Sequence, residues 1–165
     1  KVFMLLNSLS AEASSILLQL VQAYNFDLFS FDSSTFLRLE QKNYNPLIIK
    51  HTEPHVMSVG SYHVEHLSLI ADPEVTFLIY SSAGDRKLSL IPIAYRFETM
   101  GIVQQIAELN NERNNICSNE QQSMVHIIDF CNQWALDIQC SSWFLTHAQP
   151  NPQVSVTCGL VQNCY

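Results

Sequence analysis

Side chains that could do chemistry are densest in the stretch SVGSYHVEHLSLIADPEVTF, residues 58–77. Imidazoles and carboxylates are ligands that zinc accepts, and a carboxyl group removed from water can act as a general acid or base. A small metal-dependent or acid–base hydrolase is therefore one hypothesis for this segment. The residues that such an enzyme would use are His63, Glu65, His66, Asp72 and Glu74.

The spacing of these residues argues against a metal site. Side chains alternate between the two faces of a strand, so His63 and His66 would point in opposite directions and only His63 and Glu65 would share a face. The order also differs from H-E-x-x-H, which places two histidines on one face of a helix. We therefore expect no metal ligand and no catalytic residue here. The segment is interpreted as a strand, a polar turn and the start of a second strand.

The Asp72-Pro73-Glu74 step is interpreted as part of that turn. Two carboxylates at this spacing could support acid–base chemistry if one of them were desolvated. An aspartate before proline more often starts a turn, because its side chain binds the backbone and proline fixes the next φ. We expect the polar residues of this region, together with an exposed indole near the C-terminus, to bind a protein partner. The expected surface consists of Tyr62, His63, Glu65, His66, Asp72, Glu74 and Trp143.

Composition and charge argue against several classes of function. The 165 residues are 47% hydrophobic and 14% charged, as in a folded globular protein, and the length suits a single domain, residues 1–165. The net charge of −7 and the scattered Lys and Arg residues provide no basic face for nucleic acid. No run approaches the roughly 20 apolar residues that a membrane helix needs. Glycine-rich phosphate loops and a G-x-S-x-G elbow are also absent from the sequence, and we expect no cofactor.

The five cysteines favour a cytoplasmic protein. None of them forms a C-x-x-C pair, and the sequence has no N-glycosylation sequon, so free and mostly buried thiols in a reducing compartment are expected. A disulfide in the C-terminal region, for example between Cys140 and Cys158, is the alternative. The first residues, KVFMLLNSLSAEASS, loosely resemble a signal peptide, but their apolar run is short and a helix follows directly, so we expect them to belong to the fold.

The elements that must position these residues follow from the spacing of apolar side chains. Helical spacing predicts one helix over residues 10–24, with Ser10 as its N-cap, and a second over residues 118–140, with a capping box from Ser118 to Gln121. Trp134 lies on the apolar stripe of the second helix and is expected in the core. Between the helices, residues 34–98 contain short runs rich in β-branched and aromatic residues, separated by turn formers.

These runs predict an α+β fold, in which an antiparallel sheet of about five strands carries both helices on one face. The stretch GIVQQIAEL fits either a sixth strand or a short helix, and QVSVTCGL in the tail, residues 141–165, could add a terminal strand. Pro92 indicates a sheet edge or a bulge in the last run.

Residues 46–105 resemble a family of small uncharacterised bacterial domains, often carried on plasmids and other mobile elements. Its members have a Ser-Val-x-His-Tyr strand, then Gly-Asp-Leu-Met and Asp-Pro-Glu-Met before the next strand, and a C-terminal helix with a tryptophan. Here Ser61 replaces the histidine, and Leu67-Ser68 replaces Gly-Asp. Positions that match the pattern are Ser58, Val59, Tyr62, Leu69, Asp72, Pro73 and Glu74, with Pro92, Tyr95 and Trp134 fitting more loosely.

The resemblance implies a fold and a mobile-element context, but no reaction. Combined with the absence of a catalytic motif, it favours a non-enzymatic protein-binding or accessory protein. Its partner is expected to be an unknown protein or a second copy of the chain, with no nucleic acid and no membrane. The hydrolase that would use residues 63–74 stays the alternative.

Overall fold

The computed structural model describes residues 7–29, 34–81, 86–109, 116–118, 121–145 and 148–161. Within these ranges the chain forms two α-helices, a seven-stranded antiparallel sheet and two small two-stranded sheets. The elements are α2 (Ala11–Ala23), β1 (Thr35–Glu40), β2 (Leu47–Glu53), β3 (Val56–Glu65), β4 (Ser68–Ser81), β5 (Leu88–Phe97), the 3₁₀ helix η1 (Glu98–Met100), β6 (Ile102–Gln105), β7 (Ala107–Leu109), β8 (Ile116–Ser118), α3 (Gln121–Cys140), β9 (Phe144–Leu145), β10 (Gln149–Pro150) and β11 (Ser155–Leu160).

The large sheet has the strand order β11-β1-β2-β3-β4-β5-β6, and all of its neighbouring strands are antiparallel. The predicted α+β class with an antiparallel sheet is confirmed, but the predicted number of about five strands is wrong. One additional strand is β6, from the stretch that fitted either strand or helix. The other is β11, which returns from the C-terminal region to pair with β1, so that Leu37 lies opposite Cys158.

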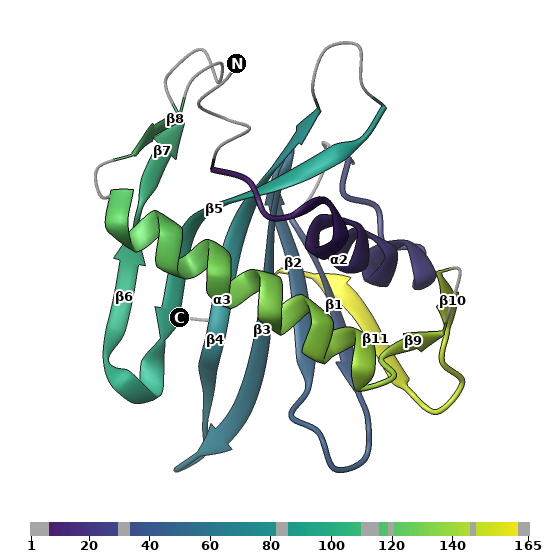
Figure 1. The fold of residues 1–165 in the computed structure, drawn as a ribbon. Coiled ribbons are helices and arrows are strands. Elements are labelled where there is room, and N and C mark those ends of the chain that lie inside the picture. The colour runs from purple at the N-terminus through teal and green to yellow at the C-terminus, as the bar shows by residue number, and fades with distance from the viewer. Residues whose placement is uncertain are drawn as a thin grey trace.

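The main core lies between the helices and the sheet. Figure 1 shows α2 and α3 in front of the sheet, with α3 running diagonally across several strands. Ser10 caps α2 as predicted, because its hydroxyl accepts a hydrogen bond from the Ala13 amide at 3.0 Å. The buried apolar cluster contains side chains from both helices and from β1 to β5, including Leu17, Leu20, Leu37, Ile49, Val59, Val75, Phe77, Leu90, Met124 and Ile127.

The second helix begins later than predicted. Ser118, the expected N-cap, lies in β8 and pairs with Ala107 of β7, so its backbone belongs to a strand pair. The capping-box prediction for Ser118 and Gln121 is therefore wrong, and α3 starts at Gln121. Neither described helix is long and apolar enough to cross a membrane.

Strand alternation gives the sheet a second face with a different character. Ile49 contributes to the main core, so its neighbours Ile48 and Lys50 point to the opposite side of β2. On that side, Ile48 packs with Tyr62 and Ala71 in a small apolar cluster that is separate from the main core. This opposite side also carries the polar residues considered below.

One buried polar side chain reduces the stability of the main core. His51 is only 2% exposed, and neither of its ring nitrogens has a hydrogen-bond partner. Burying an imidazole without such partners costs free energy, because its hydrogen bonds to water are lost and not replaced. His51→Leu is therefore expected to raise the free energy of unfolding by about 1 kcal/mol, measured by urea denaturation.

The matched control for this substitution is His63→Leu, at a half-exposed position of the sheet. It should leave the free energy of unfolding nearly unchanged, since water already binds that imidazole. A loss of stability in the His51→Leu protein, with the control unaffected, would contradict the interpretation that the His51 ring is buried without compensation.

Candidate binding surface on the β3–β4 hairpin

The β3–β4 hairpin carries most of the residues that the sequence singled out. Glu65 of β3 pairs with Ser68 of β4, so the connection is the two-residue turn His66-Leu67. Both turn residues have positive φ, 48° and 68°, as two-residue hairpin turns of the primed type require. Asparagine and glycine usually occupy such positions, whereas leucine with positive φ is strained. The sequence therefore places an apolar side chain at the turn in spite of this backbone cost.

The end of this hairpin, residues 63–69, is termed the hairpin tip. Leu67 is 99% exposed, and the apolar side chains of Val64 and Leu69 are exposed beside it. Val64 and Leu69 are direct cross-strand partners. The tip therefore presents three neighbouring apolar side chains to water.

The polar residues of the tip gather around one carboxylate. His63 Nε2 and His66 Nδ1 each lie 3.8 Å from a Glu65 carboxylate oxygen. The expectation that the two histidines point apart is corrected here, because His66 lies in the turn and not on a strand. The His66 side chain is 91% exposed, and such solvated pairs contribute little stability. Within the described residues, no three His, Cys, Asp or Glu side chains are placed to hold a metal ion.

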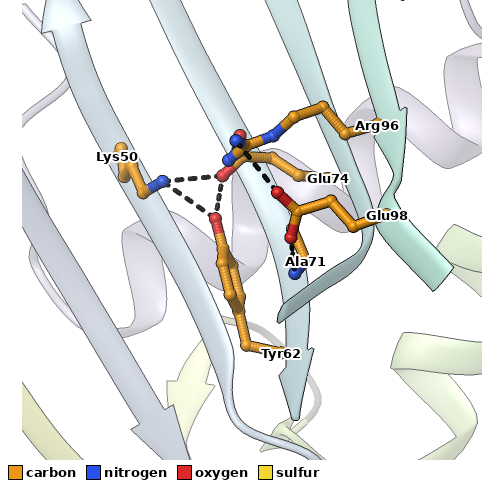
Figure 2. A network of polar contacts seen from close by, with 6 residues as sticks. All are labelled: Lys50, Tyr62, Ala71, Glu74, Arg96 and Glu98. Carbon is orange, nitrogen blue, oxygen red and sulfur yellow. Dashed lines mark hydrogen bonds and ion pairs between the residues drawn. The ribbon is translucent and has the colours of Figure 1, made fainter. Parts of the chain in front are cut away.

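Further from the tip, four charged side chains and one tyrosine form a polar network (Figure 2). Glu74 of β4 is at its centre. One carboxylate oxygen accepts hydrogen bonds from Lys50 Nζ at 2.7 Å and from the Tyr62 hydroxyl, and the other accepts from Arg96 at 2.6 Å. Lys50 Nζ also donates to the Tyr62 hydroxyl at 2.8 Å. Three strands, β2, β3 and β5, thus supply the partners of a single carboxylate.

Glu98 of η1 extends this network on its Arg96 side. Its carboxylate accepts a hydrogen bond from the Ala71 backbone N–H and lies 3.5 Å from the Arg96 guanidinium. The network therefore contains two cations and two carboxylates, and their formal charges cancel. The Glu74 side chain is 10% exposed, whereas those of Lys50 and Arg96 are 27% and 35% exposed. The central carboxylate is enclosed and its partners reach solvent.

A bulge in the hairpin brings Tyr62 to this carboxylate. The β3–β4 register shifts between Gly60 and Tyr62, opposite the segment of β4 that contains the cis Asp72-Pro73 bond. Gly60 pairs with Glu74, and a Cβ atom at Gly60 would lie 2.5 Å from the Tyr62 ring. The missing side chain at Gly60 therefore leaves room for the phenol, which is the kind of close approach that explains a glycine within a strand.

Several predictions for this segment are corrected by the structure. Asp72-Pro73-Glu74 is not a turn but lies within β4, where the bulge accommodates a proline that has no N–H to donate. Tyr62 and Glu74 are buried, so they lie beneath the surface that they were expected to form. The sequence reasoning missed Lys50 and Arg96, which belong to strands whose register no local pattern reveals. Gly60 was the available signal for the bulge.

Trp143 is also placed differently from the prediction. It is 3% exposed and belongs to the main core, although it was expected on the surface. Its backbone carbonyl accepts a hydrogen bond from the Tyr24 hydroxyl at 2.5 Å, and its ring lies edge-on to Tyr44 at 5.8 Å. Trp134, expected in the core, is partly buried against that core.

The three cysteines whose side chains the structure describes differ strongly in the expected reactivity of their thiols. Cys131 is completely buried, and burial raises the pKa of its thiol far above the ordinary value, which suppresses the nucleophilic thiolate. Cys140 and Cys158 are exposed free thiols, so the structure does not contain the disulfide that was the alternative between them. We expect a thiol reagent at pH 8 to modify Cys140 and Cys158 and to leave Cys131 unmodified until the protein unfolds.

Peptide mapping by mass spectrometry measures this difference directly, with a sample labelled in denaturant as the control for complete modification. Rapid labelling of Cys131 in the folded protein would show that the core around α3 opens far more readily than its packing implies.

Comparison with known proteins assigns the sequence to a family. A family model described as a domain of unknown function, DUF6908, matches residues 16–142, which include the whole β3–β4 hairpin and every residue of the polar network. No curated protein and no solved structure matches the chain. Since the match covers well over half of the sequence, the chain belongs to the DUF6908 family of domains of unknown function.

Proposed function

We propose that this chain is a non-enzymatic protein-binding protein, and that it binds its partner by inserting the hairpin tip into an apolar pocket of another protein. The observation that carries the proposal is the complete exposure of Leu67 at a turn where its φ is positive. Leucine is costly there both for its backbone and for its contact with water. An apolar side chain presented in this way is a natural anchor for a partner's pocket.

The structure beneath the tip supports its use as a rigid anchor. β3 and β4 are long strands, and the network around Glu74 ties them to the neighbouring strands through Lys50 and Arg96. A preorganised loop loses less conformational entropy when it binds than a mobile loop does. The role of Tyr62 and Glu74 in this proposal is to hold the base of the tip.

The exposure of the polar side chains favours binding over hydrolysis. A catalytic group needs a site that excludes water and leaves its proton-transfer atoms accessible to substrate. His66 and Glu65 are exposed on the tip, and both oxygens of the Glu74 carboxylate are engaged by Lys50, Tyr62 and Arg96. The hydrolase alternative would require these groups to regroup in a concave site. The mobile-element context is carried by the sequence resemblance described above and extends the proposal to an accessory role in such an element.

Site-specific photo-crosslinking in lysate of the native host tests the proposal. A photoreactive amino acid replaces Leu67 in one variant and Val125 in a matched control, because Val125 is an exposed apolar residue on α3, away from the tip. We expect one discrete adduct from position 67 and none of that mass from position 125. An adduct of twice the chain's mass would identify a second copy as the partner. Identical adduct patterns from both positions would contradict a role for the tip.

A further inference from the structure

We propose that a cavity between the end of α3 and the β1–β2 loop binds an organic cation, meaning an alkylammonium, quaternary ammonium or guanidinium group. Such a group can belong to a free small molecule or to a lysine or arginine side chain of another protein. This site differs from the hairpin tip in its residues and its chemistry, so it goes beyond the function proposed above.

Three of the ten residues that line the cavity are aromatic. Its volume is about 320 Å³, and both tryptophans of the chain line it, Trp134 from α3 and Trp143 from the segment that follows. Tyr44, from the loop between β1 and β2, contributes a third ring and lies edge-on to Trp143 at a centroid distance of 5.8 Å. Aromatic rings attract cations through the negative charge on their faces, most strongly for tryptophan. The volume lies at the lower end of the range for small-ligand sites.

Asp137 is the one charged side chain among the described residues that line the cavity. It is exposed, and among the described residues its carboxylate has only the neutral Gln133 amide as a hydrogen-bond donor, at 3.1 Å. Asp137 also lies in the last turn of α3, which contains no basic residue. The carbonyl end of a helix carries a partial negative charge, so an aspartate there is unfavourable unless a cation compensates it. None of the described residues that line the cavity is basic.

The donor set selects an organic cation over a metal ion. Zinc needs three or four converging ligands and calcium needs six or more oxygen atoms, whereas this cavity offers a single carboxylate among amides and hydroxyls. Trp143 is only 3% exposed, so Tyr44 and Trp134 present the accessible rings. These rings beside one carboxylate suit a cation that is large, weakly hydrated and partly apolar. The polar groups of Asn43, Asn45 and Ser141 at the wall can accept hydrogen bonds from an ammonium or guanidinium group.

Tryptophan fluorescence reports on this site, because both tryptophans of the chain line the cavity. The purified protein is titrated with choline and, as a neutral analogue of the same shape, with 3,3-dimethylbutan-1-ol, and calorimetry is run in parallel. We expect saturable binding of choline with a Kd in the millimolar range or tighter, and binding of the alcohol at least about tenfold weaker. Equal affinity for the two compounds would overturn the proposal, as would no change in either signal up to about 50 mM choline.

Two substitutions on α3 test whether choline binds at this cavity. Asp137→Asn should weaken choline binding about tenfold, whereas Asp129→Asn, which removes the same charge from an exposed position on the same helix, should leave it unchanged. Equal effects of the two substitutions would show that only the overall charge matters and would contradict the site.

A third titration separates the two sources of the cation. Peptides that contain lysine or trimethyllysine are compared with choline and with arginine amide. Tighter binding of a peptide assigns the cavity to a basic protein segment, and tighter binding of a free amine assigns it to a small molecule.

Discussion

Replacing Glu74 with glutamine is expected to lower the free energy of unfolding by about 3 kcal/mol. The carboxylate accepts hydrogen bonds from Lys50, Tyr62 and Arg96, and its side chain is nearly enclosed. Glutamine has almost the same shape but no charge, so Lys50 would lose its counter-ion and Arg96 would keep only Glu98, at 3.5 Å. One of its polar atoms would also be a donor where an acceptor is required. Both cations reach solvent, which keeps the loss below that of a fully buried pair.

Urea denaturation of Glu74→Gln and Glu40→Gln in parallel measures this effect. Glu40 pairs with Arg38 at 2.8 Å and its own side chain is 48% exposed, so its substitution removes a charge from the same sheet at a carboxylate that water already reaches. The control should change stability by less than about 1 kcal/mol. If both substitutions lowered the free energy of unfolding by the same small amount, the network around Glu74 would contribute no more stability than an ordinary surface ion pair.

Replacing Gly60 with alanine is expected to cost about 2 kcal/mol, although the change adds a single methyl group. That group would lie 2.5 Å from Cε2 of the Tyr62 ring and 3.2 Å from Cβ of Glu74. Because the strand backbone cannot move freely within the sheet, the ring has to give way. Its hydroxyl would then leave the Glu74 carboxylate and Lys50.

A double-mutant cycle with Tyr62→Ala identifies the cause of this loss. Once the ring is removed, the methyl group at position 60 has room, so Gly60→Ala should cost less than about 0.5 kcal/mol in the Tyr62→Ala background. Additive costs in the double variant would show that the methyl group disturbs the backbone and not the ring.

Short-range sequence patterns predicted those helices and strands whose formation depends mainly on residues close to one another in the sequence. The helix over residues 10–24 was readable, because its apolar stripe and the Ser10 cap are local features, and α2 forms at Ala11–Ala23. Pro92 was a correct signal for a bulge. Pro92 pairs with Phe77 and Ala94 pairs with the adjacent Thr76, so the register between β4 and β5 shifts directly after the proline. The alternating runs of residues 34–98 likewise indicated strands of an antiparallel sheet.

Features that depend on distant residues were not predictable in this way. The stretch QVSVTCGL was a correct signal for a terminal strand, and β11 forms within it. Its partner β1 lies more than a hundred residues earlier, however, and no local pattern reveals that pairing. Ser118 fits a helix cap by spacing, but pairing with Ala107 competes successfully for its backbone. Trp143 was expected to be exposed, but it packs in the main core, where Tyr24 binds its carbonyl and Tyr44 contacts its ring from other parts of the chain.

The candidate site shows the same contrast between features that local sequence predicts and features that depend on distant residues. The sequence drew attention to Tyr62 and Glu74, because they stand in the motif that resembled a known family, but it gave them the role of an exposed surface. Their actual role depends on Lys50 and Arg96, which reach Glu74 only because β2, β3, β4 and β5 are neighbours in the sheet. Strand order and register therefore decide whether a polar motif is a surface or a buried support.

The most direct test of the central claim, that the hairpin tip binds a protein, is a titration of the purified partner from the crosslinking experiment. Wild-type protein is compared with Leu67→Asp and with Val125→Asp, which places the same charge at another exposed apolar position. Insertion of Leu67 into an apolar pocket predicts that Leu67→Asp weakens binding at least about tenfold, while Val125→Asp binds as the wild type does. Wild-type affinity in the Leu67→Asp variant would contradict the account.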